Sequence, residues 1–275
     1  MTATTPAVHH SAQHASNVRL STVGILRSEW IKLRSLRSTV WAYAVILVLQ
    51  IAIGLLVISV TVGRDGLPSG TSLTDIPGLG ILGVTAGVLF AQLVVSVLGV
   101  LVISGEYSTG QIRSSFAAVP KRLPVLWAKA VVFFVVTYVV SFIGILISYL
   151  VTAPILAGAG VSSNLFSSEV IVPLLGAALY LALIGVLAMG IGAILRSTAG
   201  GIAAALGLLL VVPVIFQLIP ADWSASIVDW LPGSVGRAIY DASAVFDWWQ
   251  ALLIMLGWIV IAFGTAAVLM RRRDA

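Results

Sequence analysis

The chain has no cysteine, and only 9% of its 275 residues are charged. The absence of cysteine excludes disulfides, thiolate metal sites and cysteine nucleophiles. A soluble domain usually carries about 25% charged residues, whereas 60% of this chain is hydrophobic. A water-soluble fold could not bury so much apolar surface, so the composition predicts an integral membrane protein.

Six apolar segments are long enough to cross a bilayer, which takes about 20 residues each. They cover residues 40–62, 81–104, 125–150, 171–195, 201–219 and 248–270. The fifth contains Pro213, which predicts a kink. We therefore expect an all-α, polytopic membrane protein with six transmembrane helices, in which residues 18–275 form one transmembrane domain.

Ionisable side chains are almost absent from these six segments. They contain no Asp, Glu or His, although ion-coupled carriers usually keep such groups at membrane depth. Lys129 lies near the start of the third segment, where it can reach the interface by snorkelling. His9, His10 and His14 lie in residues 1–17, which read as a disordered tail rather than a metal site. We expect no metal, no cofactor and no catalytic residues, so a stand-alone enzyme is not favoured.

A phosphate-binding loop is also missing. None of the three lysines, at positions 32, 121 and 129, follows the glycine pattern of Gly-x-x-x-x-Gly-Lys-Ser/Thr. The chain therefore cannot bind and hydrolyse ATP by that route. If it does energetic work, another polypeptide must supply the energy.

The basic residues favour one orientation. With both termini in the cytoplasm, 13 lie inside and only Arg64 and Arg237 lie outside. The inside set is Arg19, Arg27, Lys32, Arg34, Arg37, Arg113, Lys121, Arg122, Lys129, Arg196, Arg271, Arg272 and Arg273. Because cytoplasmic loops carry the excess of Lys and Arg, we expect a protein of the cell membrane with both termini on the cytoplasmic side.

Residues 18–38 predict a helix at the membrane surface. Arg27, Lys32 and Arg34 fall on its polar side and Trp30 on its apolar side, while Glu29 breaks the pattern. A basic face opposite Trp suits an interfacial helix on anionic lipid. The alternative is a plain basic flank to the first span. Nucleic acid is not favoured as a partner, because an apolar run follows directly.

Two loops between spans have distinct compositions. Residues 105–122 are a polar segment in which Ile112, Phe116 and Val119 form one apolar edge of a short helix that stops before Pro120. This edge suits a groove on a partner protein or the bilayer surface. Residues 220–247 mix aromatic and acidic residues, which predicts short helices at the outer interface.

The first of these loops carries a family resemblance. Glu106-Tyr107-Ser108-Thr109-Gly110-Gln111-Ile112-Arg113, followed by Ala117-Ala118-Val119-Pro120-Lys121-Arg122, resembles the Gly-Glu-Tyr-x-x-Gly-Thr-Ile-Arg…Pro-Arg-Arg run in permease subunits of ABC-2 type ATP-binding cassette transporters. Gln111 and Lys121 depart from that run without removing its charge pattern. The resemblance covers residues 105–122 by motif and most of the chain by layout.

The resemblance implies an exporter driven by a separate ATPase subunit, which would hold ATP and Mg. The short helix would then be the coupling helix seated on that subunit, and the N-terminal helix would be the connecting helix. The residues implied at the coupling contact are Glu106, Tyr107, Thr109, Gly110, Ile112, Arg113 and Phe116. Family members work as permease dimers, and the sequence leaves a homodimer and a heterodimer open.

Polar residues inside the spans are candidates for a transport pathway. They are Gln50, Thr85, Gln92, Ser96 and Gln217, and each either contacts substrate or joins helices. A pathway without charges favours lipids, peptides or hydrophobic drugs. Gly185, Ala188 and Gly192 allow a close helix approach, either within one permease or between two. Two other functions stay open: a non-transporting membrane regulator or anchor, and an ATP-independent carrier.

Overall fold

The computed structural model describes residues 22–63, 78–108, 122–161, 163–241 and 244–272. These residues form helices and no strand. Six helical segments are long and apolar enough to cross a membrane, which indicates a multi-pass membrane protein. The six predicted spans are thereby confirmed as helices.

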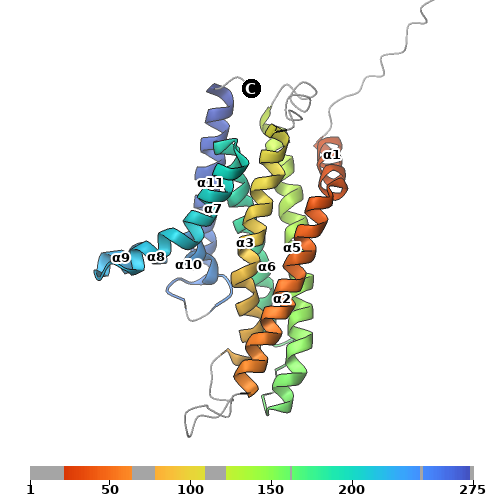
Figure 1. Cartoon of the computed structure of the whole chain (residues 1–275), viewed down its shortest axis with the longest axis vertical. Coiled ribbons are helices and arrows are strands. Elements are labelled where there is room, and N and C mark those ends of the chain that lie inside the picture. The colour runs from red at the N-terminus through yellow and green to blue at the C-terminus, as the bar shows by residue number, and fades with distance from the viewer. Residues whose placement is uncertain (1–21, 64–77, 109–121, 162, 242–243, 273–275) are drawn as a thin grey trace, which may run out of the picture.

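The long helices pack side by side (Figure 1). A shorter helix, α1 (Thr22–Ser35), precedes them. The spans are α2 (Arg37–Gly63), α3 (Leu79–Ser108), α5 (Arg122–Gly158), α6 (Ser168–Leu195), the series α7 (Thr198–Leu206), η2 (Gly207–Val211) and α8 (Val212–Gln217), and α11 (Trp248–Arg272). Between the last two spans lie α9 (Asp222–Asp229) and α10 (Pro232–Arg237).

The second span does not end where the sequence predicted. A polar run from Gly105 onward was expected to be a loop, but α3 continues through Glu106 and Tyr107 to Ser108. The short helix predicted before Pro120 lies at 109–121, outside the described residues, and stays a prediction. The surface position predicted for α1 is likewise not shown by its helical structure alone.

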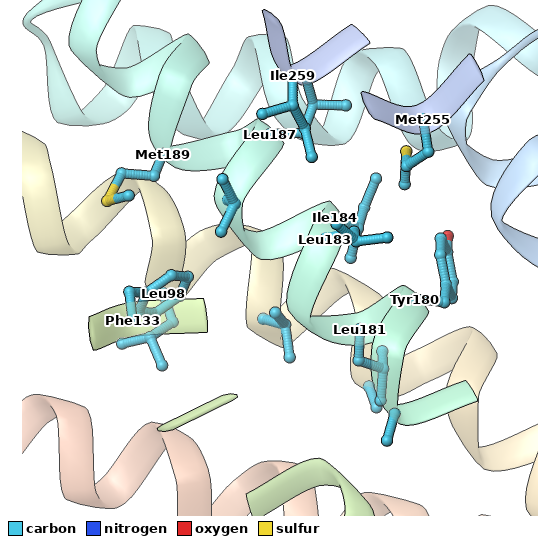
Figure 2. Close-up of a cluster of buried hydrophobic side chains, with 14 of the residues drawn as sticks. Leu98, Phe133, Tyr180, Leu181, Leu183, Ile184, Leu187, Met189, Met255 and Ile259 are labelled. Carbon is cyan, nitrogen blue, oxygen red and sulfur yellow. The ribbon is translucent and has the colours of Figure 1, made fainter. Parts of the chain in front are cut away.

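Helix α6 forms the centre of the bundle. It packs against α3, α5 and α11, and 72% of an apolar stretch of 18 residues in α6 is buried. Figure 2 shows the core around it, where Tyr180 to Met189 of α6 meet Leu98 of α3, Phe133 of α5, and Met255 and Ile259 of α11. Van der Waals packing, rather than expulsion of water, holds such helices together in lipid.

Small residues let the neighbours of α6 approach closely. A Cβ on Gly99 of α3 would overlap the backbone carbonyl of Gly185, and a Cβ on Gly192 would lie 2.8 Å from Ile103. Ala188 is 2% exposed. The close approach predicted for Gly185, Ala188 and Gly192 therefore occurs within one chain, since all three face this chain's own helices.

The fifth span has a π-helical segment immediately before Pro213. Proline lacks an N–H and its ring collides with the carbonyl four residues earlier. In η2 the N–H of Val212 donates to the carbonyl of Gly207, five residues back, which is the pattern of a π turn. The backbone is thus irregular before Pro213, as a π segment, and the predicted kink itself stays a prediction. Beyond it, α8 and α9 extend away from the bundle (Figure 1).

Helix α10 returns toward the bundle and is seated on α6. A Cβ on Gly236 would overlap the ring of Tyr180, and a Cβ on Gly176 would meet the carbonyl of Ile239. Val235 is fully buried. The short helices predicted within residues 220–247 are present as α9 and α10, and their place at the outer interface stays a prediction. Helix α10 is fixed against the core.

Candidate functional site

Four charged side chains meet between three helices at one end of the bundle. Glu29 and Lys32 come from α1, Glu106 from the last turns of α3, and Lys129 from the first turns of α5. We call these four residues the ion cluster. In it, residues from before the first span, from the end of the second and from the start of the third contact one another.

The distances within the ion cluster are those of hydrogen-bonded ion pairs. The Nζ atom of Lys129 donates to Oε2 of Glu29 at 2.5 Å and to Oε1 of Glu106 at 2.8 Å. The Nζ atom of Lys32 donates to Oε1 of Glu29 at 2.7 Å and to Oε1 of Glu106 at 3.3 Å. Each lysine therefore bridges both carboxylates, and the cluster as a whole is neutral when all four groups are ionised.

The ion cluster is largely closed to solvent. The side chains of Glu29, Glu106 and Lys129 are 3%, 9% and 6% exposed, and that of Lys32 is 26% exposed. The pKa of Lys32 is raised above its usual value. Burial acts to lower this pKa, but the hydrogen bonds and negative charges of Glu29 and Glu106 together outweigh burial. Lys32 is therefore charged at neutral pH.

A cavity of about 280 Å³ adjoins the ion cluster. The four charged residues line one part of it. Leu33, Leu36, Leu101, Val102, Val132 and Phe133 line the apolar part. It lies beside the break between α1 and α2 at Leu36.

The same end of α3 is joined to the turn between α6 and α7. The guanidinium of Arg196 lies over the ring of Tyr107, 5.4 Å from its centroid, which is a cation–π distance. Thr198 Oγ1 donates to Ser104 Oγ at 3.0 Å, and Arg196 also donates to the carbonyl of Leu269 on α11 at 3.4 Å. The last turns of α3 thus contact α1, α5, the α6–α7 turn and, through Arg196, α11.

The residues predicted at the coupling contact are divided by this geometry. Glu106 and Tyr107 belong to the end of α3 just described. Thr109, Gly110, Ile112, Arg113 and Phe116 lie outside the described residues. Glu106 was expected at the junction of span and loop; it lies in the last turns of α3, and its carboxylate contacts lysines of α1 and α5.

The residues predicted for the interfacial helix also divide into two sets. Arg27, Trp30 and Arg34 are exposed. Lys32, predicted on the polar side with Arg27 and Arg34, instead contacts Glu106 and is 26% exposed. Lys129 does not snorkel, because the carboxylates of Glu29 and Glu106 surround its ammonium group.

The five pathway candidates differ in their contacts, and two of them join helices. Nε2 of Gln50 donates to the carbonyl of Val84 on α3 at 2.8 Å, and Gln92 accepts a hydrogen bond from Tyr180 on α6. The hydroxyls of Ser96 and Thr85 donate to carbonyls of their own helix. Gln217 differs from them, since it lines a second cavity between α8 and α10.

Glu29 and Lys129 are the residues of the ion cluster that were not among the predicted site residues. Lys129 was noted only as a lysine near the start of the third segment, and Glu29 only as a break in the pattern. Glu29 stands out as the only acid in a basic helix and three residues before Lys32, which is a spacing for a pair on one helix face. Among the described residues, no group of three or more His, Cys, Asp or Glu is arranged to hold a metal ion. No protein-family model matches the chain, and no curated protein matches its sequence.

Proposed function

We propose that this chain is the membrane-spanning permease subunit of an ATP-binding cassette exporter whose ATPase is a separate subunit. The observation that carries the proposal is the connection of the α3 end, through the ion cluster and Tyr107, to α1, α5 and the α6–α7 turn. Residues 109–121, which hold the resemblance to a coupling helix, follow this end directly.

Mechanical coupling requires that a push on one segment moves several helices together. Ion pairs between buried side chains resist separation, because each charge left alone in a low-dielectric site is costly. A displacement of residues 109–121 by the ATPase would therefore move α1, α3 and α5 as one unit. This is rigid-body switching about a subunit interface, with ATP binding as its trigger.

The distribution of charge supports an external energy source. In the six described spans, Asp, Glu, Lys and Arg occur only near helix ends, at Arg37, Glu106, Arg122, Lys129, Glu169, Arg271 and Arg272. An ion-coupled carrier needs such groups at mid-depth, where its coupling ion binds. The polar groups that are present at depth are amides and hydroxyls, which fits amphipathic cargo such as lipids, peptides or hydrophobic drugs.

Co-purification with the ATP-binding cassette subunit encoded nearest to this chain tests the partner. We expect wild type and the control Glu169→Gln to retain the ATPase, since Glu169 is exposed at the far end of α6. Phe116→Asp and Arg113→Glu should lose it. Equal recovery of the ATPase with all four proteins would contradict a contact through residues 109–121.

Transport in vesicles tests coupling separately from binding. We expect the wild-type complex to move a fluorescent phospholipid analogue in an ATP-dependent manner. The variant Glu106→Gln, which breaks the ion cluster, should still assemble with the ATPase but transport poorly. Transport by the lone chain without ATP would favour an ATP-independent carrier. Assembly without any ATP-dependent movement of lipid, peptide or drug would favour a membrane regulator.

A further inference from the structure

A second cavity, of about 340 Å³, lies among α8, α9, α10 and the segment between α10 and α11. We call it the α9–α10 cavity. Its polar lining comes from Gln217, Asp229, Ser234, Arg237 and Asp241, and Phe246 lines its apolar side. It is far from the ion cluster, because span five begins beside Ser104 and crosses to the opposite side before Gln217.

The α9–α10 cavity carries charges of both signs in its lining. Within the part of the chain that the structure describes, neither Asp229 nor Arg237 forms an ion pair. In the ion cluster, by contrast, opposite charges are in direct contact. An anion and a cation that line one cavity without pairing are available to a ligand that carries both charges.

The wall that carries Arg237 is fixed. Burial raises the pKa of Tyr240 to about 12, and the positive charge of Arg237 offsets part of this rise. The ring of Tyr240 packs against Tyr180 at 5.9 Å between centroids, and Gly236 lies directly on that same ring. Arg237 is thus held from the core of the bundle, while α8 and α9 form the other wall.

Aromatic side chains surround the α9–α10 cavity. Phe246, in its lining, packs edge-on against Trp230 at 5.2 Å, and Trp258 donates from Nε1 to the carbonyl of Trp230 at 3.1 Å. Trp223, Trp230, Trp248 and Trp249 are all about half exposed or more. Tryptophans gather in this way at the level of lipid headgroups, which supports a place for the cavity near that level.

We propose that the α9–α10 cavity binds the phosphoethanolamine headgroup of a phospholipid. The ammonium group would donate to the carboxylates of Asp229 and Asp241 and to the amide oxygen of Gln217, and Phe246 adds a ring face for the cation. The phosphate would accept hydrogen bonds from the fork of Arg237. The acyl chains would continue along the exposed apolar residues of α8, Val214 and Ile215.

Other ligands fit this lining less well. An inorganic phosphate or an anionic headgroup meets two carboxylates beside the single guanidinium. A metal cation meets the charge of Arg237. A phosphocholine headgroup has no N–H to donate to the two carboxylates. The inference concerns binding alone, and it holds whether or not the chain is an exporter.

Lipid binding to the full-length, detergent-purified protein tests the proposal by native mass spectrometry. The probes are phosphatidylethanolamine, phosphatidylcholine and phosphatidylglycerol with identical acyl chains. We expect phosphatidylethanolamine to bind with the highest affinity, and Asp229→Asn and Arg237→Gln each to weaken it roughly tenfold or more. Asp222→Asn, an exposed change on the same α9 helix outside the cavity, should leave affinity unchanged.

Three outcomes would overturn the proposal. The first is equal affinity for the three lipids. The second is loss of binding by Asp222→Asn to the same degree as by Asp229→Asn. The third is binding of free phosphoethanolamine as tight as that of the lipid, which would assign the cavity to a soluble ligand. Circular dichroism and a retained melting temperature establish that each variant is folded.

Discussion

Replacement of Lys129 by methionine tests the ion cluster directly. At the 2.8 Å between Nζ of Lys129 and Oε1 of Glu106, the Coulomb energy is roughly 6 kcal/mol for an effective dielectric constant of about 20. Desolvation of each buried ion costs several kcal/mol, so the intact cluster contributes little net stability. Lys129→Met removes one counter-charge but leaves both carboxylates buried, which should destabilise the fold by about 3–5 kcal/mol.

The structure also predicts an order among the variants. Lys32→Met changes the net charge of the cluster by the same amount, but the side chain of Lys32 is 26% exposed against 6% for Lys129. Water can compensate for its loss in part, so its effect should be smaller. The double variant Glu106→Gln with Lys129→Met leaves a neutral pair of Glu29 and Lys32, and should recover most of the lost stability.

Reversible unfolding in mixed micelles, titrated with sodium dodecyl sulfate, measures these differences. The control Glu169→Gln should remain within about 0.5 kcal/mol of wild type, as exposed substitutions usually do. If Lys129→Met also stays within that range, or if Lys32→Met is the more destabilising of the two, the burial argument fails.

Three further predictions follow from other contacts. The pKa of Lys32 is raised in the folded protein, so its contribution to the free energy of unfolding is complete below the usual pKa of 10.5 and is lost as pH rises past the folded pKa. The difference in stability between wild type and Lys32→Met should therefore stay constant from about pH 6 to about pH 9 and shrink at higher pH. Gly236→Ala forces a Cβ into the ring of Tyr180 and should cost about 1–3 kcal/mol in mixed micelles, whereas Gly257→Ala, which meets nothing within 4 Å, should not destabilise. Tyr180→Phe leaves the side-chain oxygen of Gln92 without its hydrogen bond and should cost about 1 kcal/mol by the same titration.

Those three predictions have clear contrary results. A wild-type to Lys32→Met gap that changes between about pH 6 and about pH 9 would show that another group controls the pairing. Equal stability of Gly236→Ala and Gly257→Ala would mean that α10 is not seated on Tyr180. An unchanged Tyr180→Phe would show that Gln92 finds another donor.

The spans were predictable from the sequence because a continuous apolar run has few alternatives in a bilayer. Backbone groups must be paired inside such a segment, and a helix does this without reference to the rest of the chain. The runs at 171–195 and 248–270 accordingly match α6 and α11 closely. Pro213 likewise indicated an irregular span, since its missing N–H acts locally.

The ion cluster was not predictable in the same way. Glu106 reads as the start of a loop, because a lone carboxylate ends a membrane span unless a counter-charge is near. Here the counter-charge comes from Lys129, which in turn contacts Glu29 a hundred residues away. The pattern of polar and apolar residues in α1 shows only that Glu29 is an acidic residue in a basic helix. The pairing depends on how three helices pack, which no local periodicity contains.

The pathway candidates show a related limit. Gln50 and Gln92 look alike in the sequence, as single amides in apolar runs, and either could face a channel or a neighbouring helix. The structure places both against other helices. Gln217 lines a cavity beyond Pro213, where α8 leaves the bundle.

The uneven enclosure of the spans determines how freely each can vary. Only 11% of an apolar stretch of 18 residues in span five is buried inside the protein, against 72% of the corresponding stretch in α6. Exchanges among Leu, Ile, Val and Phe at Leu210, Val211 and Ile215 would alter only contacts with acyl chains. In α6 the same exchanges would displace neighbours at van der Waals distance. Substitutions should therefore accumulate in span five during evolution, whereas the side chains of α6 should keep nearly the same volumes.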